Sequence, residues 1–156
     1  MIITKGYKPE DKPRLVEINS ACYSGIQRPS PAEFDQMLDH EVFVGSELAI
    51  RTDWGSPTIK NKVIGFAIVR ENILGHPYLW SIAVDPAYQG RGVGGNLLRE
   101  VIKFYTLAKA QEISLHVHPD NPAMKLYFDY GFRVRHVAKN WYQAEGDGLY
   151  MWRALP

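Results

Sequence analysis

Hydrophobic and polar positions along the chain follow two periods, which predict strands and helices in a mixed order. Apolar residues that alternate or form short runs predict strands over residues 2–7, 42–50, 62–71, 78–84, 113–118, 132–137 and 149–153. Apolar residues spaced three or four positions apart predict helices over residues 9–22, 31–39, 95–110 and 121–130. The order β-α-α-β-β-β-α-β-α-β-β favours one mixed sheet with helices on both faces.

Local signals mark the ends of two helices and one long loop. Ser30 followed by Pro31 and Glu33 predicts a helix start, because a capping hydroxyl, a proline at the first position and an early acid all favour one. Gly131 predicts a left-handed end to the helix before it. Residues 51–62 are irregular and lie between two apolar stretches, so they predict a long hairpin loop.

The composition is that of an ordinary folded domain. The chain has 156 residues, of which 46% are hydrophobic and 22% charged. These values exclude a disordered chain, a collagen-like repeat and a coiled coil. The length predicts one domain over residues 1–156. Lys and Arg number 18 and Asp and Glu 17, for a net charge of +1, so we expect no nucleic-acid partner.

The cysteine count and the hydropathy of the sequence indicate in which cellular compartment the protein is expected. Cys22 is the only cysteine, which excludes an intramolecular disulfide and fits a reducing compartment. No apolar run approaches the ~18 residues that a membrane-spanning helix needs. Residues 1–11 are too polar and too acidic for a signal peptide. We therefore expect a cytoplasmic protein without a membrane partner.

Residues 81–95 are the most informative part of the sequence, because a strand ends there, a glycine-rich turn follows and a long helix begins. Glycine lets the backbone adopt positive φ and approach a ligand closely. The free N–H groups at a helix start favour an anion. These features predict a pyrophosphate cradle, with Gln89 and Arg91 as further donors at its rim. The alternative is a tight turn without a ligand.

Two nucleotide-binding motifs are excluded at this turn. No Gly-Lys-Ser/Thr follows it, which excludes a Walker-type loop, and glycines at positions 90, 92, 94 and 95 do not match Gly-x-Gly-x-x-Gly. Instead, Gln-Gly-Arg-Gly-Val-Gly over residues 89–94 resembles the Gln/Arg-x-x-Gly-x-Gly/Ala signature of the GNAT acetyltransferases. Residues 121–132 resemble the second cofactor segment of the same family, in the expected order along the chain.

This resemblance covers nearly the whole chain and implies the GNAT fold. That α/β fold (α+β in some schemes) has a central, mostly antiparallel sheet of about seven strands, two of which splay apart to form a slot for acetyl-CoA. The cofactor-binding residues it implies are Ile82, Ala83, Val84, Gln89, Gly90, Arg91, Gly92, Val93, Gly94, Gly95, Asn121 and Tyr127. Backbone groups of Ile82 and Val84 would pair with the pantetheine arm. The spacing from Asn121 to Tyr127 is one residue shorter than the family's usual spacing.

The resemblance also implies transfer of acetyl from the thioester to a primary amine, by direct attack in a ternary complex. Tyr127 matches the tyrosine that protonates the departing thiolate, and a phenol with a pKa of about 10 stays protonated at neutral pH. His116 is the candidate base, since an ordinary histidine titrates at about 6.5. Tyr78 and His116 would together hold a water that relays the proton of the amine. The base is therefore His116, Tyr78 or this water. We expect no metal, because no carboxylate or cysteine completes a site with His116 and His118.

The acceptor side resembles the protein N-terminal acetyltransferases, including those acting on ribosomal proteins and on Met-starting chains. Trp141 and Tyr142 occupy the place of the hairpin aromatics that grip the substrate backbone there. Tyr23 belongs to the opposite wall. His118 lies on the same strand face as His116, and it either substitutes for His116 or lines the mouth. The family's Phe-Pro-aromatic motif is missing near Tyr23, and the hairpin over residues 51–62 is extra, so the acceptor pocket is expected to differ.

Three hypotheses about function follow. The first is an acetyl-CoA-dependent enzyme that acetylates the α-amine of a protein or peptide. The second keeps the chemistry with a small amine as acceptor, such as an antibiotic, a polyamine or an amino acid. The third is a non-catalytic acyl-CoA-binding module. The chain is expected to be a monomer or a homodimer. Trp54 or Trp152 could mark an interface, although for Trp152 packing in the last strand is the favoured interpretation.

Overall fold

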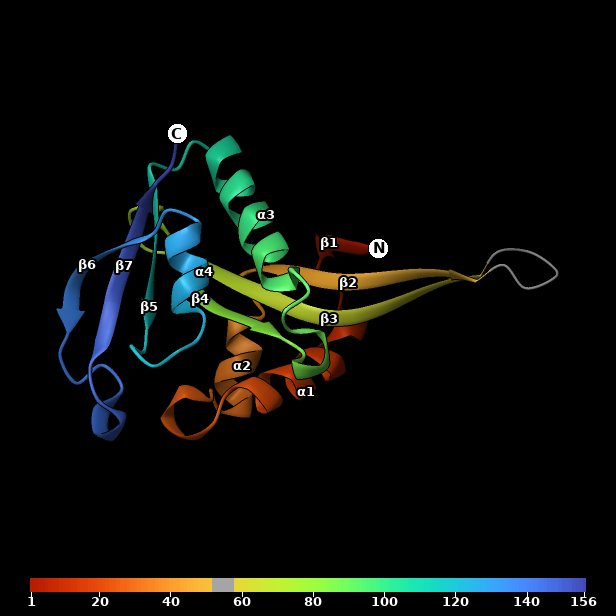
Figure 1. Ribbon diagram of the computed structural model, residues 1–156, viewed down its shortest axis with the longest axis horizontal. Helices are drawn as coiled ribbons and strands as arrows, with labels where there is room; N and C mark the ends of the chain where they lie inside the picture. Colours follow the sequence, from red (N-terminus) through yellow and green to blue (C-terminus); the bar gives the residue numbers. More distant parts are fainter. Residues whose placement is uncertain (52–57) are drawn as a thin grey trace.

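The computed structural model describes residues 1–51 and 58–156, and its centre is a seven-stranded sheet (Figure 1). The strands lie in the order β1-β2-β3-β4-β5-β7-β6. Their bounds are β1 Ile2–Gly6, β2 Glu41–Arg51, β3 Thr58–Glu71, β4 Pro77–Val84, β5 Glu112–Val117, β6 Arg133–Ala138 and β7 Gly148–Ala154. All neighbouring strands are antiparallel except β4 and β5. The predicted fold class is thereby confirmed.

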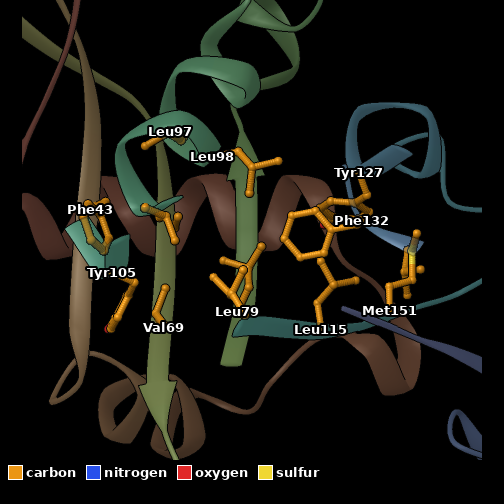
Figure 2. Packing of buried hydrophobic residues seen from close by; sticks show 14 of the residues in the cluster. Phe43, Val69, Leu79, Leu97, Leu98, Tyr105, Leu115, Tyr127, Phe132 and Met151 are labelled. Atoms are coloured by element: carbon orange, nitrogen blue, oxygen red, sulfur yellow. The ribbon is translucent and has the colours of Figure 1, made fainter. Parts of the chain in front are cut away.

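Helices cover both faces of the sheet, as the order of elements predicts. Helices α1 (Lys12–Cys22) and α2 (Pro31–Met37) lie on one face, and α3 (Val93–Leu107) and α4 (Met124–Asp129) lie on the other (Figure 1). Two apolar cores result. Helices α1 and α2 pack around Phe66, whereas α3 and α4 pack over a core that includes Leu97, Tyr127 and Phe132 (Figure 2).

The parallel pair β4–β5 is the weakest junction of the sheet. Its only ladder partners among the described residues are Tyr78 and Ser114. Beyond that point the two strands diverge, so the C-terminal half of β4 has no strand on its β5 side. A parallel ladder supplies evenly spaced backbone hydrogen bonds, and their loss leaves an opening in the middle of the sheet. The splayed strands implied by the family resemblance are therefore present.

Some predicted boundaries were wrong by a few residues. Strand β3 begins at Thr58 and pairs with β2 as far as Arg51, so the predicted loop over 51–62 is shorter than expected. Helix α4 begins at Met124, because the Asn121 side chain accepts the Ala123 N–H at 2.9 Å and holds a turn before the helix. Trp54 lies outside the described residues.

Local capping signals are present where the sequence places them. The Ser30 side chain accepts the Glu33 N–H, and the Glu33 side chain accepts the Ser30 N–H, which forms a capping box at the start of α2. Gly131 follows α4 with a φ of +86°. In the described part of the chain, no helix is both long and apolar enough to span a membrane.

Phe132 tests the α3–α4 core. Its side chain is fully buried, so Phe132→Ala should lower the free energy of unfolding by about 3–5 kcal/mol. Phe128→Ala is the matched control, because Phe128 is 41% exposed. Its substitution should lower the free energy of unfolding by only a small fraction of the Phe132→Ala effect. Urea denaturation of both variants measures the difference. Equal costs would contradict the assignment of Phe132 to the core.

Candidate active site

Two cavities open at the divergence of β4 and β5. The first, of about 620 Å³, lies against the glycine-rich turn and is called the turn cavity. The second, of about 500 Å³, lies between the α1–α2 connection and the β6–β7 hairpin and is called the hairpin cavity. Four residues line both cavities, so the two spaces meet there; they are Tyr23, Ile82, Asn121 and Tyr127.

The glycine-rich turn has the backbone geometry of an anion site. Gly90 and Gly92 have φ of +74° and +82°, a region that favours glycine. Gly92 caps α3 without any side-chain hydrogen bond, so the first N–H groups of the helix remain available to a ligand. A Cβ on Gly95 would lie 2.9 Å from the Tyr130 hydroxyl oxygen. The turn therefore depends on glycine for both its conformation and its packing.

An ion pair connects the start of the glycine-rich turn to helix α1. The Arg14 guanidinium of α1 forms an ion pair with Asp85, directly after β4, and also donates to the Val63 carbonyl at 3.2 Å. Asp85 in turn accepts the Ala87 N–H at 2.9 Å. The start of the turn is thus fixed relative to α1 and β3.

The free edge of β4 is partly occupied by side chains. The Val84 carbonyl accepts the Gln89 amide at 3.0 Å and the Cys22 thiol at 3.1 Å, and the Ile82 carbonyl accepts the Tyr23 hydroxyl at 2.6 Å. A carbonyl has two lone pairs, so both of those on Val84 are used. The expected pairing of this edge with a ligand is therefore limited to its N–H groups and the remaining lone pair of Ile82.

The side chains of the predicted cofactor set differ in their access to the turn cavity. Gln89 folds back on β4, and the Arg91 guanidinium lies over the Tyr88 ring at 5.1 Å. Val93 is 1% exposed and Ala83 is 5% exposed, both within the apolar cores. These residues can contribute mainly backbone groups, in agreement with a cradle made of amides.

Tyr127 lies where the cavities meet. Its ring packs edge-on against Phe132, with ring centres 5.9 Å apart (Figure 2). Its hydroxyl makes no hydrogen bond within residues 1–51 and 58–156. Burial raises the pKa of Tyr127 well above its ordinary value, so the phenol keeps its proton at neutral pH. Asn121 also lines both cavities, and it uses Oδ1 for the turn before α4.

Tyr78 and His116 form a hydrogen-bonded pair across the β4–β5 junction. The Tyr78 hydroxyl and the His116 Nδ1 are 2.9 Å apart. Burial, helped by the charges of His136 and Arg70, lowers the pKa of His116 to about 4, whereas burial raises the pKa of Tyr78 to about 12. At neutral pH both groups are uncharged. The sequence-based expectation of a histidine titrating at about 6.5 does not hold for this environment.

The β6–β7 hairpin covers this pair. Trp141 stacks on His116, with ring centres 3.6 Å apart and planes 4° apart. Tyr142 lines the hairpin cavity, and burial raises its pKa to about 12. The Gln27 amide donates to the Glu145 carboxylate at 2.7 Å. This contact, called the clasp, joins the α1–α2 connection to the hairpin.

His118 is placed differently from the prediction. Its Nδ1 accepts the Asp120 N–H at 3.1 Å, so its Nε2 carries the proton and donates to the Glu145 carbonyl at 2.8 Å. Both ring nitrogens are therefore committed to the backbone, and His118 lines neither cavity. These contacts connect the end of β5 to the hairpin. Among the described residues, no group of three His, Cys, Asp or Glu side chains could hold a metal ion.

Trp80 and Arg70 are among the cavity residues that the sequence-based prediction did not include. Trp80 follows Tyr78 by two positions on β4, and strand alternation places it on the same face. Arg70 lies opposite Tyr78 in the β3–β4 pairing. Alternation along β4 could have identified Trp80. Arg70 could not be identified, because its position depends on the register between two strands.

The sequence pattern of the acetyltransferase (GNAT) family matches residues 13–132. The chain is 30% identical over 149 residues to N-alpha-acetyltransferase RimI of Mycobacterium tuberculosis, covering 92% of this chain and 85% of that protein. It is 33% identical over 153 residues to an uncharacterized protein of Mycobacterium leprae, covering 93% of this chain and 38% of the longer relative. The fold also resembles Ard1 from Thermoplasma volcanium, with a TM-score of 0.83, 18% identity, and coverage of 99% and 98% of the two chains.

These matches identify the chain as a member of the GNAT acetyltransferase family. Members of this family use acetyl-CoA. The turn over residues 89–95 and Tyr127 lie within the matched region.

The pKa of His116 gives a direct test of this environment. A titration followed by NMR of the labelled imidazole should show a midpoint near pH 4, because burial disfavours the charged ring. A lowered histidine pKa stabilises the fold above about pH 6.5, and this contribution should fall as the pH drops toward 4. Trp141→Ala should expose the ring and move the midpoint up. A wild-type midpoint near 6.5 would contradict the described burial.

Proposed function

We propose that the protein is an acetyl-CoA-dependent N-acetyltransferase acting on the α-amine of a protein or peptide. The observation that carries the proposal is the meeting of the turn cavity and the hairpin cavity at Tyr127. An acyl donor and an acceptor amine can approach each other there from opposite sides of the sheet opening. The name of the mycobacterial relative, an N-alpha-acetyltransferase, supports the class of acceptor.

The residues around the turn cavity fit acetyl-CoA. The positive-φ glycines and the uncapped start of α3 supply N–H groups for its pyrophosphate. The N–H groups of Ile82 and Val84 would pair with its pantetheine arm along the free edge of β4. Asn121 would contact the arm near Tyr127 through its Nδ2 group. When bound, acetyl-CoA supplies the activated acetyl group.

Tyr78 and His116 would take the proton from the attacking amine. With both groups uncharged at neutral pH, the Tyr78 hydroxyl can donate to the unprotonated Nδ1 of His116 and present an oxygen lone pair to the hairpin cavity. A proton accepted at that oxygen, directly or through one water, is balanced by transfer of the hydroxyl proton to Nδ1. The low pKa of His116 means that it returns this proton readily to solvent.

Tyr127 would donate the proton that the departing thiolate needs. Its hydroxyl lies at the junction without a competing hydrogen bond among the described residues. General acid catalysis of this kind contributes about 10²–10⁴-fold. The Tyr78–His116 pair and Tyr127 therefore have separate tasks, since one accepts a proton and the other donates one.

The acceptor class is tested by CoA release in the presence of acetyl-CoA and a panel of amines. The panel holds short peptides, including a Met-starting peptide and an Ala-starting peptide, together with a polyamine and free amino acids. We expect turnover on peptides, with the acetyl group found on the α-amine by mass spectrometry. Turnover confined to the small amines would overturn the acceptor class. Acetyl-CoA binding without any turnover would favour a non-catalytic module.

Tyr127→Phe should lower kcat by about 10²-fold or more, because it removes only the proton donor. The dissociation constant for acetyl-CoA should stay within about twofold, because the ring remains in place. Tyr105→Phe is the matched control, since Tyr105 is a buried tyrosine of the same core outside both cavities. An unchanged kcat in Tyr127→Phe would remove the general-acid role.

A further inference from the structure

Arg70 is a cation of the hairpin cavity that has no polar partner among the described residues. It is exposed on β3, directly opposite Tyr78. Its guanidinium carbon lies 5.0 Å from the Tyr78 ring centre and 4.6 Å from the Trp80 ring centre. It makes no hydrogen bond or ion pair with any residue in the described ranges. Stacking on two rings holds the planar group in place and leaves its edge N–H donors free.

The other charged groups that line this cavity are already engaged. The Arg28 guanidinium donates to the carbonyls of Tyr23 and Ser20 at 2.6 and 2.7 Å, at the end of α1. The Glu33 carboxylate accepts the Ser30 N–H in the α2 capping box. With His116 uncharged at neutral pH, the lining holds two guanidinium groups against one carboxylate. Such a cavity attracts an anion and disfavours a polyamine.

The distance from the reacting groups suits an extended acceptor chain. Arg70 lies one strand farther from the β4–β5 opening than Tyr78 does. An extended chain advances about 3.3–3.6 Å per residue, whereas neighbouring strands lie about 4.8 Å apart. An α-amine held between Tyr78 and Tyr127 would therefore bring the second or third residue of the acceptor close to the guanidinium.

We propose that the hairpin cavity selects acidic peptides, in which a carboxylate at the second or third residue is bound by the free edge of Arg70. This inference rests on the proposed function, whose acceptor it specifies. A guanidinium binds a carboxylate with two parallel hydrogen bonds, which a neutral amide cannot match. Arg70 is thus a specificity-determining residue that touches the acceptor and takes no part in proton transfer.

The test is the binding of matched peptides to the full chain saturated with CoA, measured by calorimetry. The peptides are identical except for Glu, Gln or Lys at residue two or at residue three. The wild-type chain should bind one of the Glu peptides about tenfold more tightly than its Gln counterpart. Arg70→Gln should reduce this ratio to less than about twofold, and Arg70→Glu should make the Lys peptide the better ligand. Arg135→Gln is the control, because Arg135 also stacks on a tryptophan, Trp152, but lies outside both cavities.

Equal binding of the Glu and Gln peptides by the wild-type chain would overturn the inference, as would a preference that persists in Arg70→Gln. Failure of every peptide to bind would also overturn it. Mass spectrometry of acetylated products tests the proposed function separately. Acetylation of α-amines without an acidic preference would leave that function standing and remove the role of Arg70. Acid-selective binding without acetylation would support the role of Arg70 and remove the proposed function.

Discussion

The divergence of β4 from β5 is the constraint on which the rest of the site depends. After the Tyr78–Ser114 partners, the two strands separate, and one edge of a central strand is left without a ladder. Buried backbone groups without partners destabilise a fold, so such an edge persists only where other groups satisfy it. Here Tyr23, Cys22 and Gln89 supply donors to the exposed carbonyls. The opening is thus stabilised by the residues that also form its walls.

Helix α1 connects the two sides of this opening. Its C-terminal end delivers Cys22 and places Tyr23 against β4, while Arg14 near its start holds Asp85 at the glycine-rich turn. The side chains of Leu15 and Ile18 between them are buried against the sheet. A single helix therefore fixes the position of the turn relative to the cavity junction. The precision of the site depends on packing on the face of the sheet opposite α3.

Sequence patterns were sufficient for features that are local. The glycine-rich turn, the capping box at Ser30 and the left-handed Gly131 all follow from residues close together in the chain. The order of elements indicated a mixed sheet with helices on both faces, and the family resemblance implied the GNAT fold. The features that could not be foreseen depend on tertiary contacts. Both ring nitrogens of His118 are used by backbone groups, and the pKa of His116 falls because of burial. The place of Arg70 depends on a β3–β4 register that shifts between Ile68 and Val69.

The clasp between Gln27 and Glu145 joins the α1–α2 connection to the β6–β7 hairpin, and both segments line the hairpin cavity. The two residues that it joins are 118 positions apart in sequence, and the hydrogen bond is exposed to solvent. A hydrogen bond between two segments so far apart in sequence restrains their separation and therefore the width of the hairpin cavity. One exposed hydrogen bond contributes about 1 kcal/mol, so it restrains this width without locking it. The hairpin cavity can therefore widen at a small cost in free energy, while the two apolar cores on the faces of the sheet stay packed.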